Sequence, residues 1–204
     1  WAGFPVASIK YCLKEANFDL NDIDHICINI DPKANYFKKI LFLLKYRPSL
    51  KLVFNRLKKK KKYDNIRELI NKEFDGSNFK GQINNVEHHY AHLSSAFHVS
   101  PFEESCILSV DGFGDFASTA WGYGKNNKIR IDNKIHFPHS LGIFYQALTQ
   151  FLGFKNYGDE YKIMGLAPYG KPKYVEQLRK ILLIKTNGNF ELNLDYFKFH
   201  KENF

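Results

Sequence analysis

Apolar residues recur along the chain with two spacings, and each spacing predicts a different element. A spacing of three to four residues predicts an amphipathic helix, whereas a short consecutive apolar run bounded by turn residues predicts a buried strand. The helical spacing covers 5–17, two segments on either side of Pro48, and the ranges 65–74, 88–98, 140–151 and 173–184. Strands are predicted over 26–30, 82–87, 105–110, 118–124, 128–137 and 190–199, and residues 157–170 are predicted to form a glycine-rich loop. Because helices and strands alternate, the predicted fold class is α/β.

The composition narrows the class of protein. A chain of 204 residues with 44% hydrophobic and 25% charged residues is typical of a globular protein, which excludes disordered and fibrous classes. The longest apolar run, Ile40–Leu44, is far shorter than the roughly 18 residues of a membrane helix, so no membrane partner is expected. Cys12, Cys27 and Cys106 form no CxxC pair, which indicates reduced thiols and a cytoplasmic location. Because the chain begins with tryptophan and ends inside an aromatic stretch, we expect an internal piece of a longer protein.

The net charge of +9 is concentrated in one segment. Residues 33–62 hold 12 Lys or Arg and no Asp or Glu, which leaves 18 basic against 21 acidic residues in the remainder. This segment, above all Lys58–Lys62, could neutralise the phosphates of nucleic acid or of an anionic membrane. The alternative is a solvated helical face whose leucines pack inward: Leu41, Leu44, Leu52 and Leu57. No aromatic–glycine RNA signature and no zinc-finger spacing accompanies the lysines, which favours the solvated face over a nucleic-acid partner.

Three histidines lie close together in the run His88-His89-Tyr90-Ala91-His92. On a helix, the imidazoles of His88 and His92 point from the same face and could bind one metal ion, whereas His89 points away. Two histidines need at least one more ligand, and an ordinary surface pair is the alternative interpretation. No Glu follows the first histidine, so the zinc-protease motif is absent.

An acidic, glycine-rich run follows the predicted strand over 105–110. In Val110-Asp111-Gly112-Phe113-Gly114-Asp115, a carboxylate could bind a metal, and the glycines could let backbone N–H groups approach a phosphate. A tight turn between two strands also favours Asp and Gly, so both interpretations stay open.

Residues 158–170 contain two carboxylates, a lysine and three glycines. Long irregular loops are more often functional than short ones, which favours a functional loop here. A compact surface loop is the alternative interpretation.

These runs occur in the same order in a known family. Residues 87–97 and 109–115, followed by 140–145 with 149–154 and then by 159–170, resemble the carbamoyltransferase family of the NodU, CmcH and TobZ type. The resemblance extends from about residue 4 to residue 175, with a weaker opening at Phe4-Pro5 and Tyr11-Cys12-Leu13.

This resemblance implies O-carbamoylation of a small acceptor such as a nodulation factor, a cephem or an aminoglycoside. Members make carbamoyl-adenylate from carbamoyl phosphate and ATP in a YrdC-like domain. They transfer the carbamoyl group in an N-terminal Kae1-like domain of the actin/Hsp70-type ATPase (ASKHA) fold. Residues 1–204 resemble part of that Kae1-like domain, incomplete at both ends, so the C-terminal YrdC-like domain is expected to be absent from the chain.

The resemblance also implies roles for individual residues. His88 and His92 match the helical iron ligands, and Asp111 matches the acidic residue at the metal and the nucleotide, which makes it the expected catalytic residue. The expected cofactors are a divalent metal, Fe²⁺ in the family, and ATP or carbamoyl-adenylate. Five residues are expected to bind the nucleotide or the acceptor: Gly112, Gly114, Asp115, Glu160 and Lys162.

Several parts of the family pattern are not in the sequence. They are the opening His-Asp-x-Ser-Ala-like strand with its general base, a further metal-binding Asp, and the YrdC-like domain, so the chain alone is expected to be inactive.

Carbamoyl phosphate, ATP and a small hydroxyl acceptor are the expected partners. Threonylcarbamoyl transfer to tRNA is an alternative within the same fold, and a non-catalytic module that binds nucleic acid or membrane through 33–62 is a second. The run Glu160–Gly170 resembles the small-molecule branch, which favours carbamoyl transfer to a small molecule.

Overall fold

The structure is a computed structural model that describes residues 4–61, 66–74 and 79–202, with the side chains of 56–61 left out. Its α-helices are α1 (Val6–Ala16), α2 (Tyr36–Tyr46), α3 (Leu50–Lys61), α4 (Ile66–Glu73), α5 (His88–Phe97), α6 (Leu141–Phe151), α7 (Glu160–Leu166) and α8 (Val175–Arg179). Its strands are β1 (His25–Ile28), β2 (Gln82–Asn85), β3 (Glu104–Gly114), β4 (Ala117–Lys125), β5 (Lys128–His136), β6 (Leu182–Ile184) and β7 (Phe190–Leu192). Short 3-10 helices span Leu20–Asp22, Ala167–Tyr169 and Leu194–Tyr196. The predicted α/β class is confirmed.

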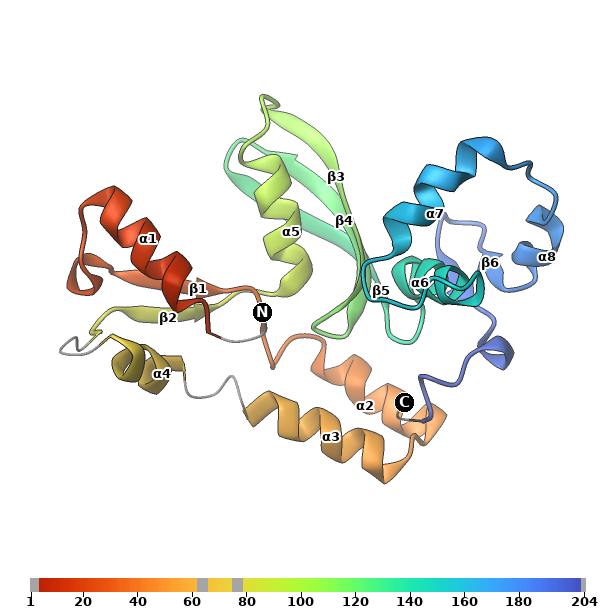
Figure 1. Cartoon of the computed structure of the whole chain (residues 1–204), viewed down its shortest axis with the longest axis horizontal. Helices are drawn as coiled ribbons and strands as arrows, with labels where there is room; N and C mark the ends of the chain where they lie inside the picture. The colour runs from red at the N-terminus through yellow and green to blue at the C-terminus, as the bar shows by residue number, and fades with distance from the viewer. Residues whose placement is uncertain (1–3, 62–65, 75–78, 203–204) are drawn as a thin grey trace.

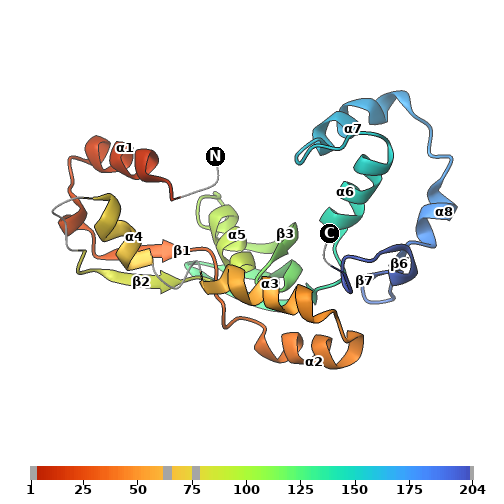
Figure 2. The same ribbon diagram turned by 60° about the horizontal axis from the view of Figure 1, so that its bottom comes forward.

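Three small sheets organise the described part of the chain (Figure 1). Strands β1 and β2 pair in parallel, β3, β4 and β5 form an antiparallel sheet in that order, and β6 pairs with β7 antiparallel. The three-stranded sheet lies in the middle, with the β1–β2 pair on one side and α6, β6 and β7 on the other (Figures 1 and 2). Helices α2 and α3 lie side by side beneath it.

The β1–β2 pair shares one apolar cluster with α1 and α4. Its buried members are Leu20, Ile70 and Phe79, and partly buried residues from both helices and both strands pack against them. Arg67 of α4 closes this unit, because its guanidinium donates to the carbonyl oxygens of Phe79 and Gly81. The strand predicted over 26–30 therefore forms, as β1. Its residues alternate between exposed and partly buried, so only one face of the strand is covered.

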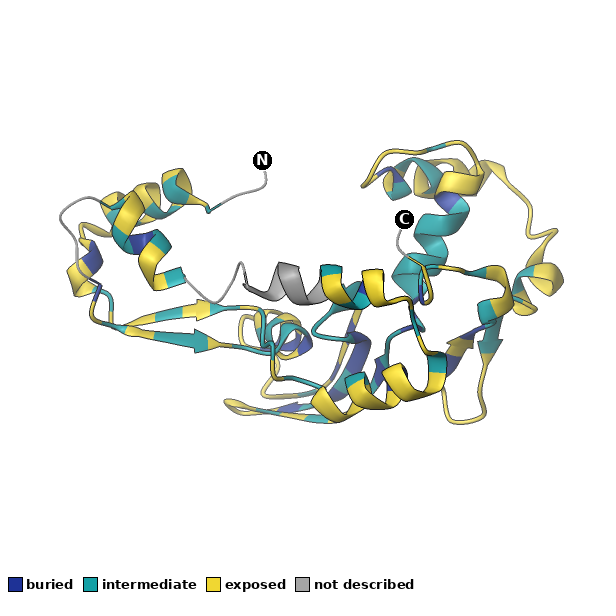
Figure 3. Ribbon diagram, turned by 90° about the horizontal axis from the view of Figure 1, so that it is seen from below, coloured by how far each residue is buried: buried dark blue, intermediate teal, exposed yellow. Residues whose placement is uncertain are grey.

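The central sheet is covered on one face by α5. Leu93 and Phe97 of the helix pack on Ile107 and Ala120, and this face holds much of the buried core (Figure 3). Strand β4 lies in the middle of the sheet and carries small residues where the helix approaches. A Cβ at Gly124 would lie 2.7 Å from the Phe97 ring. Strand β3 forms as predicted, but buried and exposed positions alternate over 105–110, so the predicted buried strand is covered on one face only.

The second half of the chain differs from its predicted elements. Residues 157–170 contain α7 and a 3-10 helix, so the prediction of a continuous loop is wrong. Helix α7 spans Glu160–Leu166 and includes Gly165. The helix predicted over 173–184 ends at Arg179, and Leu182–Ile184 pairs with Phe190–Leu192. The strand predicted over 190–199 is correspondingly short.

The basic segment folds as two helices separated near Pro48, as predicted. Leu52 is buried, but Leu41 and Leu44 are exposed, and the side chain of Leu57 lies outside the described residues. Phe42 takes the inward position on α2, because its ring packs against the rings of Phe116 and Phe137. The side chains of Lys58–Lys62 lie outside the described residues too, so the structure tests neither the favoured solvated face nor the phosphate-binding alternative for this run. Within the described ranges, no helix has the length and apolar character needed to cross a membrane.

His136 makes the stability of this fold depend on pH. Burial, followed by the positive charges of Lys38 and Lys134, lowers the pKa of His136 from 6.5 to about 4, although Glu87 acts in the opposite direction. Between these two values the unfolded chain binds more protons than the folded chain, so the free energy of unfolding decreases as the pH falls from about 6.5 to about 4. The slope stays below roughly 1.4 kcal/mol per pH unit for this group, because one imidazole exchanges at most one proton.

Urea denaturation at several pH values tests this dependence. Replacing His136→Gln, which keeps a donor for Asn35 Oδ1, is expected to flatten the loss of stability between pH 6.5 and pH 4.5. Identical slopes for the variant and the wild type would show that other groups cause the dependence. His25→Gln, on an exposed position of β1, is the matched control.

Candidate metal centre

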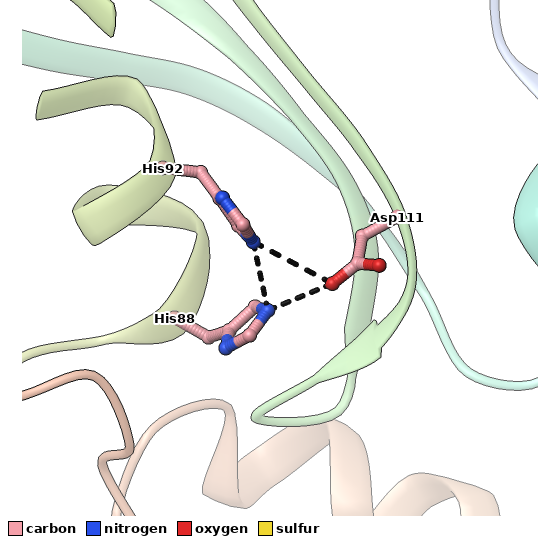
Figure 4. Close-up of side chains that lie close together, drawn as sticks. All are labelled: His88, His92 and Asp111. Atoms are coloured by element: carbon pink, nitrogen blue, oxygen red, sulfur yellow. Dashed lines mark hydrogen bonds and ion pairs between the residues drawn. The ribbon is translucent and has the colours of Figure 1, made fainter. Parts of the chain in front are cut away.

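Three side chains from two elements converge at one point beside the central sheet. Figure 4 shows His88 and His92 on α5 facing Asp111 on β3. His88 Nε2 lies 2.8 Å from Asp111 Oδ2 and 3.0 Å from His92 Nε2, and His92 Nε2 lies 3.6 Å from Asp111 Oδ2. The predicted pairing of the two histidines on one helical face therefore forms, and the structure brings Asp111 to it.

Helix α5 sets the direction of the two histidines. The Glu87 carboxylate accepts a hydrogen bond from the Tyr90 N–H at 2.9 Å, so the helix begins at His88. One helical turn then separates His88 from His92. His89 points to the other side, as predicted, where it is fully buried with Nδ1 2.9 Å from Ser109 Oγ.

A bulge in β3 places Asp111. Val110 pairs with Thr119 and Gly114 pairs with Ala117, so three residues of β3 lie opposite one residue of β4. Such bulges often re-aim a side chain next to a functional site. The hairpin turn itself lies later, at residues 115–116, so Asp111 is not in the tight turn that the sequence left open.

The start of α6 supports this bulge from behind. Ser140 Oγ lies 2.7 Å from the Gly112 carbonyl oxygen and 3.1 Å from that of Asp111, and it also accepts from the Ile143 N–H. A Cβ at Gly142 would lie 2.8 Å from the Asp111 carbonyl oxygen, so only glycine lets the helix approach this closely. Sequence reasoning missed both contacts, although Ser140 stands at the position where a helix N-cap is expected.

The nitrogen and oxygen atoms that converge here are suited to bind a cation. His88 Nδ1 lies 3.3 Å from the Asn29 carbonyl oxygen, and because a carbonyl only accepts, Nδ1 carries the proton in this contact. Nε2 of His88 then faces Asp111 Oδ2 and His92 Nε2 with its lone pair. One proton could bridge a single pair of these atoms, whereas a cation satisfies all three. An ion about 2.0–2.2 Å from each donor holds neighbouring donors roughly 3.0–3.5 Å apart, close to the spacing seen here.

Asp111 is suited to hold a positive charge. Partial burial raises the pKa of its carboxyl, but contacts with His88 and the Gly112 N–H lower it, and the net pKa lies below its ordinary value. The Gly112 N–H donates to Asp111 Oδ1, which leaves Oδ2 directed at the histidines. The carboxylate is therefore ionised at neutral pH.

The two glycines of the motif have different surroundings. A Cβ at Gly114 would overlap the His88 imidazole, so the strand backbone lies directly against that ring. A Cβ at Gly112 would meet nothing within 4 Å. Gly114 therefore makes room for a metal-ligand candidate, whereas Gly112 leaves open space beside Asp111.

Of the other predicted binding residues that the structure describes, Glu160 and Lys162 make no contact with this cluster, whereas Asp115 does. Glu160 and Lys162 are on α7, where Lys162 Nζ lies 2.6 Å from Asp159 Oδ1. In the part of the chain that the structure describes, no hydrogen bond or ion pair joins either residue to the three converging side chains. Their role in binding stays a prediction. Asp115 does lie beside the cluster, but its carboxylate accepts hydrogen bonds from backbone N–H groups.

Fold and site together define an α/β chain with a candidate centre of two histidines and one carboxylate. The sequence profile of the family described as "Carbamoyltransferase N-terminus" matches residues 2–203. The chain belongs to this family, which confirms the resemblance seen in the sequence.

Longer relatives share this similarity. Nodulation protein NolNO of Sinorhizobium fredii is 35% identical over 196 residues, covering 94% of this chain and 27% of the relative. Nodulation protein NolO of Bradyrhizobium diazoefficiens is 39% identical over 113 residues, covering 54% and 20%. An uncharacterized protein of Synechocystis is 35% identical over 212 residues, covering 97% and 34%. The chain thus spans about a third or less of the length of these relatives.

Substitution of the two glycines tests the geometry of the centre. Gly114→Ala is expected to weaken Co²⁺ binding at least tenfold, because the new methyl group displaces the His88 imidazole. Gly112→Ala, with open space around its Cβ, is the matched control and should bind within about threefold of the wild type. Isothermal titration calorimetry measures both affinities, and equal affinities for the two variants would contradict this account of the centre.

Proposed function

We propose that this chain forms the metal-holding part of an O-carbamoyltransferase. The complete protein would use carbamoyl phosphate and ATP, through carbamoyl-adenylate, to carbamoylate a hydroxyl of a small molecule or sugar. The observation that carries the proposal is the convergence of His88, His92 and Asp111 in a chain of the carbamoyltransferase family. Because the chain spans about a third or less of its relatives, this activity belongs to the complete protein.

His88, His92 and Asp111 would hold the metal ion. Two imidazoles and a carboxylate are donors that suit Fe²⁺ among divalent metals. A divalent ion bound there supplies positive charge that polarises a carbonyl or phosphoryl oxygen. The chain fixes the donors in advance, because Asn29 orients the His88 ring and the bulge of β3 directs Asp111.

The surroundings of Asp111 also favour a phosphate-bearing substrate. The N-terminus of α6 packs against the Asp111 peptide through Gly142, and the first turn of an 11-residue helix carries partial positive charge. A Cβ at Gly112 would meet nothing within 4 Å, so space for a ligand is open beside Asp111. These features support the proposal that an adenylate phosphate binds beside the metal ligands.

Removal of one histidine ligand tests the metal and the reaction together. In the full-length protein, His88→Ala is expected to lose bound metal and to lower carbamoyl transfer at least 100-fold, because two donors hold an ion poorly. Metal content is measured by mass spectrometry, and transfer by incorporation of labelled carbamoyl phosphate into a panel of sugar and aminoglycoside hydroxyls. His98→Ala, at the exposed end of the same helix, is the control. Full metal content and full transfer in His88→Ala would overturn the proposal.

A change of charge at Asp111 separates its role as a ligand from its role in the strand. Asp111→Asn keeps the shape of the side chain but removes the negative charge, so metal affinity and transfer should both fall while the far-ultraviolet circular dichroism stays unchanged. Transfer at the wild-type rate in this variant would show that the carboxylate only shapes the bulge.

A further inference from the structure

The Asp115 carboxylate joins two distant backbone segments. Its Oδ2 accepts hydrogen bonds from the His88 N–H at 2.9 Å and from the Asp31 N–H at 2.7 Å. His88 begins α5, whereas Asp31 follows β1, so these segments and the β3–β4 turn meet at one oxygen atom. No other described carboxylate oxygen accepts from two backbone N–H groups so far apart in the sequence.

One of these N–H groups belongs to a candidate metal ligand. The first N–H groups of a helix have no acceptor within the helix and need one from elsewhere. Glu87 satisfies the N–H of Tyr90, and Asp115 satisfies that of His88 from another strand. A negative charge is also favourable at this end of a helix. Asp115 thus fixes the backbone from which the His88 imidazole extends.

The turn that presents Asp115 has an unusual backbone. Asp115 and Phe116 form a two-residue turn with φ angles of 48° and 74°, between the paired residues Gly114 and Ala117. Asn-Gly is the preferred pair in such turns, and a bulky aromatic residue rarely adopts positive φ. Backbone strain of this kind persists where the surrounding structure enforces it, and it clusters at functional sites.

The surroundings hold this turn in place. Asn35 Nδ2 donates to the Asp115 carbonyl oxygen at 2.8 Å, and the Asn35 Oδ1 lies 3.2 Å from His136 Nε2. The Phe116 ring packs against the rings of Phe42 and Phe137. The Phe137 N–H donates a hydrogen bond to the Phe116 carbonyl oxygen. The strained turn is therefore held at both of its residues.

We propose that Asp115 is the positioning residue of the metal centre. It acts by accepting the two N–H groups, which holds His88 at the distance from Asp111 that the ion requires. This inference rests on the proposed metal site at His88, His92 and Asp111, and it replaces the expected role of Asp115 in binding the cofactor directly. One of its two carboxylate oxygens, Oδ2, already accepts hydrogen bonds from two backbone donors.

Three variants of the protein, titrated with Co²⁺, test the role. Asp115→Ala removes the acceptor and is expected to weaken Co²⁺ binding 10- to 100-fold and to alter the d–d absorption of the bound ion. Asp115→Asn keeps an oxygen that accepts the same N–H groups, so its affinity should stay within about threefold and its spectrum should match the wild type. Asp132→Ala removes an exposed carboxylate of β5 and serves as the control.

The outcomes distinguish a positioning role for Asp115 from direct contact of its carboxylate with the ion or the ligand. An Asp115→Asn variant as weak as Asp115→Ala would show that the charge itself contacts the ion or the ligand, which overturns the proposal. Wild-type affinity and spectrum in Asp115→Ala would overturn it as well, while leaving the metal centre intact. Absence of Co²⁺ binding by the wild type would instead overturn the metal centre and this role together.

A second variant keeps the test decisive if Asp115→Ala does not fold. Asn35→Ala leaves the carboxylate in place but removes the hydrogen bond that holds the turn. A smaller loss of Co²⁺ affinity, about three- to tenfold, is expected, with an unchanged circular dichroism spectrum. Unchanged affinity in Asn35→Ala, together with a folded and weakly binding Asp115→Asn, would overturn the proposal.

Discussion

The close approach of α5 to the bulged strand β3 is the constraint on which the site depends. Lone pairs of two imidazoles and one carboxylate meet within 3.6 Å, and they can do so only because the strand has no side chain where the His88 ring lies. Gly114 makes this space, the bulge before it aims Asp111, and Gly142 lets α6 reach the back of the bulge. Two close contacts at glycines and one bulge thus place the three metal-ligand candidates.

Local pattern singled out the donors as candidates, and the family resemblance assigned them to a metal. The spacing of His88 and His92 depends only on helical periodicity, and the motif around Asp111 was recognisable because glycines accompany the carboxylate. The geometry that joins them was not accessible in the same way, because Asp115 reaches partners 27 and 84 positions away. Asn35 and Ser140 likewise act through contacts that no local pattern encodes.

The errors in the predicted elements have a similar origin. Glycines at 158, 165 and 170 favoured a loop, but the residues between them form a helical turn against α6. In α2 the regular leucines suggested the inward face, whereas the aromatic cluster around Phe116 turns Phe42 inward instead. The α/β class and the family are established, and the finer assignment to the actin/Hsp70-type ATPase fold stays a prediction.

The hydrogen bond from the Asp31 N–H has a mechanical consequence. It ties the end of β1 to the same oxygen that caps α5, so a rotation of the β1–β2 pair relative to the central sheet pulls on the backbone of His88. Ligand affinity and the angle between the two sheets are then thermodynamically linked, and the coupling is reciprocal. An ion bound by His88 would therefore favour one angle between the β1–β2 pair and the central sheet over others.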